Sequence, residues 1–180
     1  MVSKAAGRFV WADSFEGRAC VRLNSILRYA WLKHYLTVMS RLGNGLLWYC
    51  VLAAIPLVAG RDGLAVTVHI GLTALLGVMV YKLCKQLLVR ERPFVTHQTI
   101  ACVGTPLDRG SFPSGHTIHA ACFTTMLAAY EPASIVVFLP IGLSIAVSRI
   151  ALGHHYPSDV VAGGMIGVIL AMSSLKLSGL

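Results

Sequence analysis

Three stretches of the sequence hold side chains whose types and spacing could do chemistry. The last stretch, Ser148 to Asp159, places an arginine, two adjacent histidines and an aspartate between two apolar segments. The guanidinium of Arg149 is a planar set of donors that suits phosphate oxygens. His155 and Asp159 are four residues apart, so a helical backbone would put them on one face, where the carboxylate could fix the orientation of the imidazole. A histidine held in this way is suited to nucleophilic or acid–base catalysis.

A simpler interpretation of this stretch is a loop with polar helix caps, because Pro157 suits a first helical position and Asp159 the positive end of a helix. The stretch around Lys85 and Arg92 is also open to two interpretations. These residues are seven apart, about two helical turns, so both can point into one pocket if a helix continues that far. With Arg149 they would stabilise the charge of a phosphoryl transition state. The alternative is a basic rim that binds lipid headgroups or sets membrane topology.

The stretch Pro113 to His116 has the sequence Pro-Ser-Gly-His, which predicts a tight turn that enters a helix. Gly115 would let the backbone approach a ligand, and the free N–H groups of a helix start suit an anion. Ser114 could add a hydroxyl donor, and His116 could protonate a departing alkoxide and later activate water. In isolation, a serine cap beside a buried histidine would explain the same residues.

The three stretches together resemble the signature of the type-2 phosphatidic acid phosphatase superfamily. Lys85 to Pro93 matches Lys-x6-Arg-Pro, and Pro113 to His116 matches Pro-Ser-Gly-His. Ser148 to Asp159 matches Ser-Arg-x5-His-x3-Asp. The blocks occur in the same order and without a gap, and the apolar segments around them suit the membrane branch of that superfamily. The spacing of the last block selects His155 rather than its neighbour His154.

The resemblance implies a lipid phosphatase in which His155 is the nucleophile and forms a phosphohistidine, Asp159 orients it, and His116 is the acid and base. It implies these phosphate ligands: Lys85, Arg92, Ser114, Gly115 and Arg149. The implied substrate is a membrane lipid phosphate or diphosphate, such as phosphatidic acid, phosphatidylglycerol phosphate or a polyprenyl diphosphate. Two alternatives stay open: a lipid phosphotransferase that uses the same intermediate, and a non-catalytic membrane protein that binds lipid headgroups. The intact histidines at both catalytic positions argue against the second.

The composition is that of an integral membrane protein. The chain is 56% hydrophobic and only 12% charged, whereas about a quarter of residues are charged in soluble proteins. Its formal net charge of +8 would suit nucleic acid in a soluble chain. In a chain this apolar we expect no nucleic-acid partner, and we assign the charge to anionic membrane lipids and an anionic substrate.

No metal or other cofactor is expected from the sequence. Carboxylates do not cluster as magnesium ligands, and histidines do not cluster as zinc ligands. The five cysteines show neither a CxxC pair nor metal-ligand spacing, so we interpret them as small apolar residues in the packing. The sequence carries no signal for the oligomeric state.

The expected fold is all-α: a single membrane domain over residues 1–180, with a polytopic bundle of about five transmembrane helices. An amphipathic helix over residues 18–42 carries too many charges to cross and should lie in the membrane interface. Residues 44–180 form the catalytic core. The expected spans cover residues 46–59, 64–89, 114–130, 133–152 and 158–175, with a turn at 60–63. Gly163, Gly164 and Gly167 should allow close helix approach.

Alternation of five spans places all three stretches on one face of the membrane. The basic residues assigned to that face are Lys4, Arg8, Arg18, Arg22, Arg28, Lys33, Arg41, Lys82, Lys85, Arg90, Arg92, Arg109 and Arg149. The opposite face has only Arg61 and Lys176. The positive-inside rule therefore predicts a cytoplasmic pocket. A periplasmic pocket is the alternative, because many bacterial relatives work there, and the short chain resembles bacterial members, which implies the inner membrane.

Overall fold

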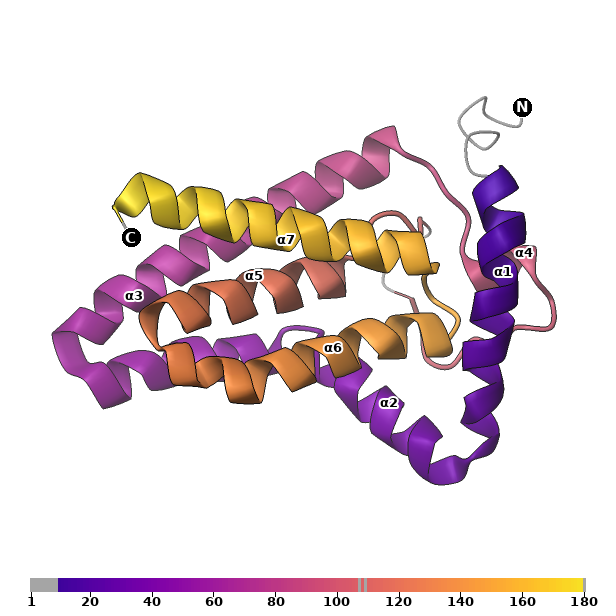
Figure 1. Ribbon diagram of the computed structural model, residues 1–180, viewed down its shortest axis with the longest axis horizontal. Coiled ribbons are helices and arrows are strands. Elements are labelled where there is room, and N and C mark those ends of the chain that lie inside the picture. Colours follow the sequence, from indigo (N-terminus) through magenta and orange to yellow (C-terminus); the bar gives the residue numbers. More distant parts are fainter. Residues whose placement is uncertain (1–9, 107, 109, 180) are drawn as a thin grey trace.

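The computed structural model describes residues 10–106, 108 and 110–179 of the chain, with side chains from residue 15 onward. The helices are α1 (Val10–Asn24), η2 (Ser25–Arg28), α2 (Ala30–Leu42), α3 (Leu46–Leu87), α4 (Pro93–Thr96), α5 (Gly115–Tyr130), η3 (Pro132–Ser134), α6 (Ile135–Ala151) and α7 (Pro157–Ser178). They are shown in Figure 1. Within the described ranges the chain forms no strand, so the predicted all-α fold is confirmed.

Helix α3 reverses its direction at Gly60, whose backbone is not helical (φ 60°, ψ −136°). Glycine adopts a positive φ without steric cost because it lacks a Cβ atom. The two arms pack closely beside the bend, since a Cβ atom on Gly63 would lie 2.7 Å from the carbonyl oxygen of Ile55. In Figure 1 the chain runs to one end of the bundle and returns along it. The chain reversal predicted between the two apolar segments is therefore present, and its non-helical backbone is confined to Gly60.

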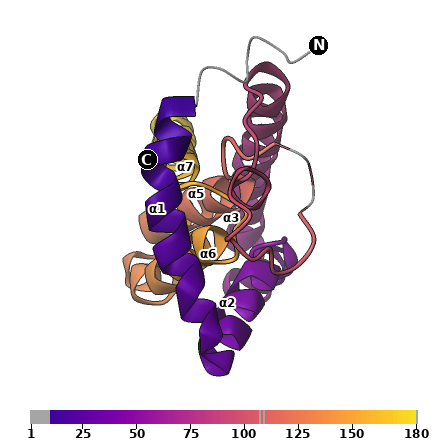
Figure 2. The same cartoon turned by 90° about the vertical axis from the view of Figure 1, so that its right-hand side faces the viewer.

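Helix α5 lies at the centre of the bundle, in contact with α3, α6 and α7 (Figure 2). Its side chains Ile118, Cys122 and Met126 are fully buried. Helix α7 packs tightly on it, because a Cβ atom on Gly167 would lie only 2.3 Å from the carbonyl oxygen of Ile118. A Cβ atom on Gly163 would lie 2.7 Å from that of Ser114. The close approach predicted from these glycines is confirmed.

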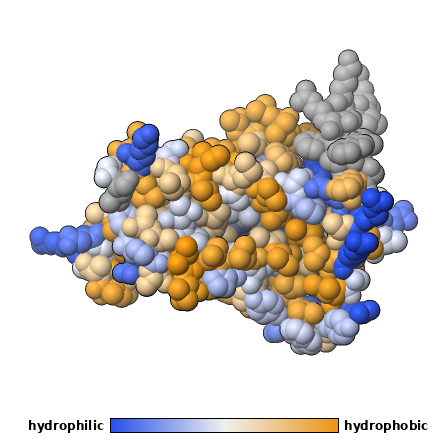
Figure 3. Space-filling view, in the orientation of Figure 1, coloured by the Kyte–Doolittle hydropathy of each residue, from blue (hydrophilic) through white to orange (hydrophobic). Residues whose placement is uncertain are grey.

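The outer surface of the bundle is apolar along its long helices. Within the described residues, three helical segments are long and apolar enough to cross a membrane: Leu46–Leu87, Pro132–Ala151 and Pro157–Ser178. Large apolar side chains such as Leu57 and Leu72 are exposed on them, and apolar side chains cover much of the face in Figure 3. This surface suits a hydrocarbon solvent. The membrane helix bundle is confirmed, while the count of five crossings stays a prediction.

The segment predicted as one helix over residues 18–42 is divided in the structure. Helix α1 ends at Asn24, a 3-10 turn follows, and α2 begins at Ala30 after an extended residue, Tyr29. The buried side chain of Asn24 anchors this break, since its Nδ2 atom donates to the carbonyl oxygens of Ala101 (2.8 Å) and Ala151 (2.9 Å). The sequence has no glycine or proline here, so the prediction of a single helix was wrong for lack of a local signal.

Candidate active site

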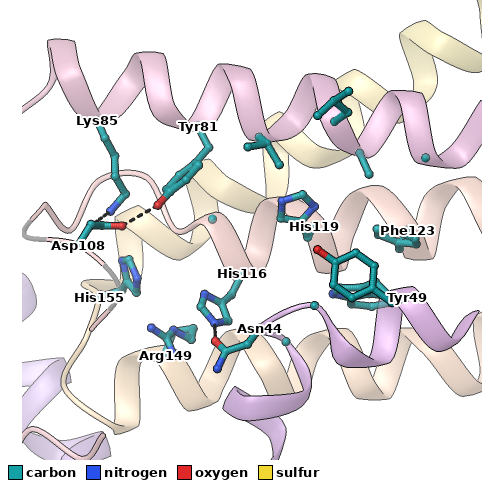
Figure 4. Close-up of a pocket in the computed structure, with 18 of the residues that line it drawn as sticks. Asn44, Tyr49, Tyr81, Lys85, Asp108, His116, His119, Phe123, Arg149 and His155 are labelled. Carbon is teal, nitrogen blue, oxygen red and sulfur yellow. Dashed lines mark hydrogen bonds and ion pairs between the residues drawn. The ribbon is translucent and has the colours of Figure 1, made fainter. Parts of the chain in front are cut away.

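The residues of the three stretches meet at one end of the bundle, around a pocket of about 390 Å³. The predicted residues that line it are Lys85, Arg92, Gly115, His116, Arg149 and His155. They come from the end of α3, the loop before α4, the start of α5, the end of α6 and the loop before α7 (Figure 4). Because the elements alternate in direction, their active-site ends gather at one place, as the sequence predicted.

Arg149 lies in the last turn of α6 and is almost completely buried. Its Nη1 atom donates a hydrogen bond to the hydroxyl of Ser40 in α2. The buried Nε atom has no hydrogen-bond partner among the described residues. A buried donor without a partner is unusual in native proteins, so this guanidinium retains donor capacity for a ligand such as a phosphate oxygen.

Lys85 and Arg92 converge on a carboxylate that the sequence did not single out. The Nζ atom of Lys85 lies 2.6 Å from Oδ1 of Asp108, and Nη2 of Arg92 lies 3.1 Å from the same oxygen. The hydroxyl of Tyr81 donates to Oδ2 at 2.6 Å. Burial acts to raise the pKa of Asp108, but hydrogen bonds from Lys85 and Tyr81 outweigh it and lower the pKa. The carboxyl group is therefore ionised and neutralises part of the basic site.

The spacing of Lys85 and Arg92 predicted that a continuous helix would bring them together. The structure brings them together without one. Helix α3 ends at Leu87, and Arg92 follows as the residue before α4. Arg92 is instead fixed by backbone contacts, with Nη1 2.7 Å from the carbonyl oxygen of His154 and Nε 3.1 Å from that of Asp108. The loop, rather than helical periodicity, turns its guanidinium toward Lys85. Arg109, a further loop residue considered from the sequence, lies outside the described residues.

His155 is buried and has a defined tautomer. Its Nδ1 atom lies 2.6 Å from the backbone carbonyl oxygen of Ser111. A carbonyl oxygen can only accept, so Nδ1 carries the hydrogen and Nε2 has the free lone pair. Burial, together with the positive charges of Arg149 and Arg92, lowers the pKa of His155 well below its usual value. The imidazole is therefore neutral near pH 7, which is the state a nucleophile needs.

Asp159 does not hold His155 by the direct hydrogen bond that a four-residue step suggested. Its Oδ2 atom lies 3.7 Å from Nδ1 of His155, beyond hydrogen-bond distance. The physical reason is that α7 begins at Pro157, so His155 precedes the helix and the helical-face argument does not apply. Asp159 caps the helix instead, accepting from the backbone N–H of Tyr156 at 2.8 Å.

A buried ion-pair network behind the pocket involves Asp159. The Nη1 atom of Arg90 lies 2.5 Å from Oδ1 of Asp159, and Nη2 lies 2.7 Å from Oε2 of Glu16 in α1. Glu16 also accepts from the backbone N–H of Ser158 at 2.7 Å. Arg90 is thus a structural residue, whereas Arg92, two positions later, lines the pocket. The Lys-x6-Arg-Pro spacing had selected Arg92 for the site, whereas no pattern in the sequence indicated the structural role of Arg90.

His116 projects into the pocket from the first turn of α5. Its Nε2 atom lies 2.5 Å from Oδ1 of Asn44, in the turn between α2 and α3 (Figure 4). Gly115 also lines the pocket, and a Cβ atom there would lie 3.1 Å from the ring of Tyr81. No motif or spacing in the sequence indicated a role for Asn44.

The structure does not bring Ser114 to the pocket wall. Ser114 is fully buried, its backbone N–H donates to the carbonyl oxygen of Asp159 at 3.0 Å, and its hydroxyl accepts from Thr117 at 3.0 Å. It therefore couples the start of α5 to α7. The predicted role of its hydroxyl as a phosphate donor has no support in this geometry.

His154 occupies a different environment from His155. It is buried but is not among the residues that line the pocket. Burial, followed by the charges of Arg149 and Arg92, lowers the pKa of His154 to about 3. The structure therefore places the histidine selected by motif spacing at the pocket and its neighbour behind it.

Away from the basic residues and the histidines, much of the pocket wall is apolar. It is lined by Trp48, Leu52, Ala74, Leu75, Val78 and Phe123, with the tyrosine ring of Tyr49 beside them. The pocket therefore joins a cationic end, which suits phosphate, to an apolar end, which suits hydrocarbon. Among the residues whose positions are described, no group of three or more His, Cys, Asp or Glu side chains is placed to hold a metal ion. Independence from metal ions stays a prediction.

Comparisons with known proteins agree with these features. A family model described as the PAP2 superfamily matches residues 66–179, a segment that contains all three stretches. The chain is 30% identical over 133 residues to undecaprenyl-diphosphatase BcrC of Bacillus subtilis, covering 72% of this chain and 67% of that protein. It is 28% identical over 182 residues to phosphatidylglycerophosphatase B of the same organism, covering 88% and 79%.

A solved structure has the same fold. The crystal structure of Aquifex aeolicus LpxE superposes on the chain with a TM-score of 0.75 at 27% sequence identity. The superposition covers 87% of this chain and 92% of that one. The match thus extends over most of the chain.

Proposed function

The chain belongs to the PAP2 superfamily and is a lipid phosphatase, and we propose that it hydrolyses a membrane lipid phosphate or diphosphate through a phosphohistidine at His155. The observation that carries this proposal is the pocket itself. At one end it brings Lys85, Arg92 and Arg149 around two histidines, and at the other it is apolar. A phosphorylated lipid has the same two parts.

The first step transfers the phosphoryl group to the protein. The Nε2 lone pair of His155 attacks phosphorus and forms the N–P bond, while the bond from phosphorus to the lipid oxygen breaks. Protonated His116 donates its proton to that oxygen, so the lipid leaves as an alcohol or, from a diphosphate, as a monophosphate. Lys85, Arg92 and Arg149 stabilise the negative charge on the remaining phosphoryl oxygens.

The second step regenerates the protein. Neutral His116 takes a proton from water, the water oxygen attacks phosphorus, and the N–P bond breaks. Inorganic phosphate leaves, His155 recovers its lone pair, and His116 is again protonated. No metal ion is needed for charge balance, because three cations surround the phosphoryl group.

Asp108 affects how the substrate enters this site. Its carboxylate is held by two of the three basic residues, Lys85 and Arg92. A phosphoryl group that binds the same donors repels the carboxylate, so it must share them with Asp108 or displace it.

The lipid itself is proposed from the relatives. They are named for undecaprenyl diphosphate and for phosphatidylglycerophosphate, and phosphatidic acid shares the same headgroup chemistry. A panel of these lipids in detergent, with inorganic phosphate measured for the purified protein and for a His155→Ala variant, tests the proposal. Phosphate release with water as sole acceptor identifies a hydrolase. Loss of the lipid phosphate only with an added alcohol, which becomes phosphorylated while no inorganic phosphate appears, identifies a transferase. Binding of the lipid without any loss of its phosphate identifies a headgroup-binding protein.

We place the protein in the bacterial inner membrane with its pocket on the cytoplasmic side. The basic residues at the pocket end of the bundle support this orientation, because positively charged ends remain in the cytoplasm. The test is a single cysteine at Thr105, an exposed residue near the pocket, in a variant without the five native cysteines. Protection from a membrane-impermeant maleimide until the cells are lysed is expected. Labelling in intact cells would place the pocket in the periplasm.

A further inference from the structure

The turn between α2 and α3 reaches the acid–base histidine of the site. Gly43, Asn44 and Gly45 form this turn, and Gly43 packs so closely that a Cβ atom on it would lie 3.0 Å from Cδ2 of His116. The Oδ1 atom of Asn44 lies 2.5 Å from Nε2 of the same ring. Figure 4 shows the Asn44 side chain beside the ring, on the side away from Lys85. The contact joins residues that are 72 positions apart.

From this contact we propose that Asn44 is a positioning residue that holds His116 with Nε2–H directed to its carboxamide oxygen, so that Nδ1 is the atom that gives and takes the proton. The inference rests on the proposed function. It concerns a residue outside positions 66–179, the segment that the family model matches.

The catalytic cycle requires an acceptor at this position. Protonated His116 carries a hydrogen on both ring nitrogens, whereas the neutral form keeps only one. A partner that accepts from Nε2 can keep its hydrogen bond in both states. If the carboxamide presented its NH₂ group instead, that group would face an N–H whenever the ring was protonated. The oxygen of Asn44 therefore suits a histidine that alternates between acid and base, and it leaves Nδ1 free for the substrate.

The surroundings of His116 make such an acceptor useful. The charged and titratable groups around the ring and along the pocket are Tyr49, Tyr81, Lys85, Arg92, Asp108, His119, Arg149, His154 and His155. Three of them are cations at neutral pH, and positive neighbours disfavour an imidazolium. A carboxamide oxygen offsets part of this cost through a hydrogen bond that is stronger when the donor is charged.

The test compares leaving groups. The alkoxide leaving group of an alkyl phosphate needs the proton from His116. The leaving group of 4-nitrophenyl phosphate departs as the stable 4-nitrophenolate without that proton. For Asn44→Leu we expect the rate of the first step, measured in a single turnover as release of the dephosphorylated lipid, to fall on the order of 10²-fold with the lipid phosphate that the wild type hydrolyses best, since general acid catalysis contributes 10²- to 10⁴-fold. The single-turnover release of 4-nitrophenol from 4-nitrophenyl phosphate should fall only a few-fold, because the second step, in which His116 is the base for both substrates, does not enter this rate. Asn44→Asp keeps the acceptor and adds a negative charge, so it should remain active and move the alkaline limb of kcat to higher pH by about one unit.

Asn24 provides the matched control, because it is the only other asparagine in the chain and its side chain bonds to backbone away from the pocket. Asn24→Leu should lower thermal stability and affect both substrates equally. Equal losses for the two substrates in Asn44→Leu, or no loss with either, would overturn the inference. If Asn44→Leu does not fold, an unshifted alkaline limb in Asn44→Asp would overturn it as well. A wild-type protein that releases no phosphate from any substrate would instead overturn the proposed function, and the inference with it.

Discussion

Two polar clusters that contain histidine lie at opposite ends of the bundle, and their hydrogen bonding differs. At the end away from the pocket, Nδ1 of His69 lies 2.5 Å from the hydroxyl of Tyr130, and Nε2 lies 2.7 Å from that of Ser174. Both ring nitrogens are therefore occupied. At the pocket, His155 uses Nδ1 for a backbone carbonyl, and its Nε2 has no hydrogen-bond partner among the described residues.

The comparison separates a structural histidine from a reactive one. The His69 cluster joins α3, α5 and α7 through neutral hydroxyls, with Thr73 of α3 also 2.8 Å from Ser174. A ring that is saturated in this way must break a hydrogen bond before it can react. His155 has a free nitrogen, nearby cations and a cavity in front of it. Both residues are histidines. His155 differs from His69 in that, among the described residues, it has a ring nitrogen without a hydrogen bond beside a cavity.

The largest expected effect is the loss of activity when the reactive histidine of the pocket, His155, is replaced. His155→Ala should lower phosphate release by on the order of 10⁴-fold, as the loss of a nucleophile does in other enzymes. His69→Ala should keep activity within a few-fold of the wild type but lose about 1–3 kcal/mol of stability, because the hydroxyls of Tyr130 and Ser174 each lose a hydrogen bond. Phosphate assays and thermal unfolding in detergent measure both. A folded His69→Ala protein without activity would contradict the distinction.

The next effect concerns the charge that surrounds only one of the clusters. Arg149→Lys keeps the positive charge but removes the planar donors, including the unpartnered Nε. The expected loss in kcat is about 10²-fold, comparable to the loss of one donor to a transition state. Steady-state kinetics on the preferred lipid phosphate measure this change. An unchanged kcat would show that charge alone suffices at this position.

A smaller effect is expected within the pocket cluster itself. His154 is adjacent to His155 in sequence but lies behind the pocket wall, so His154→Ala should retain a substantial fraction of activity, within about tenfold of the wild type. The same phosphate assay, run beside His155→Ala, makes the comparison. A dead His154 variant beside an active His155 variant would show that the nucleophile is the other residue.

The pocket cluster should make the stability of the protein depend on pH. The pKa values of His154 and His155 are lowered in the folded protein, whereas in the unfolded chain they lie at about 6.5. As pH falls below 6.5, the unfolded chain therefore binds more protons, and the free energy of unfolding decreases. Thermal unfolding at pH 7 and pH 5 should show a loss of stability that is smaller in His154→Phe. If the loss of stability between pH 7 and pH 5 is the same in His154→Phe as in the wild type, His154 is not neutral in the folded protein.

The smallest expected effect is that of a chelator. Activity should persist in EDTA, because Lys85, Arg92 and Arg149 supply the positive charge. Vanadate should inhibit, since it adopts the five-coordinate geometry of phosphoryl transfer. Loss of activity in EDTA that magnesium restores would contradict the metal-independent mechanism.

The sequence predicted more of the reactive cluster than of the structural one, for a physical reason. Lys85, Arg92, His116, Arg149 and His155 lie at helix ends, and alternating helices bring such ends together. Predictions that relied on a continuous helix were wrong, since residues 18–42 divide into two helices and His155 precedes α7.

Contacts made by loops and by distant hydroxyls left no sequence pattern. Asp108 and Asn44 lie in loops whose positions depend on packing, and Tyr130 and Ser174 are 61 and 105 residues from His69. No local period connects such residues. Only the folded bundle brings them together, so these partners could not be found from spacing.

The central claim is that His155 receives the phosphoryl group, and trapping the intermediate tests it most directly. In His116→Ala, 4-nitrophenyl phosphate can still phosphorylate the nucleophile because its leaving group needs no acid, while the second step lacks its base. The intermediate should accumulate. Rapid quenching and mass spectrometry of the peptides at alkaline pH should find the phosphate on His155 and none on His154. Phosphate on His154, or nitrophenol release from this variant without a phosphorylated histidine, would contradict the account.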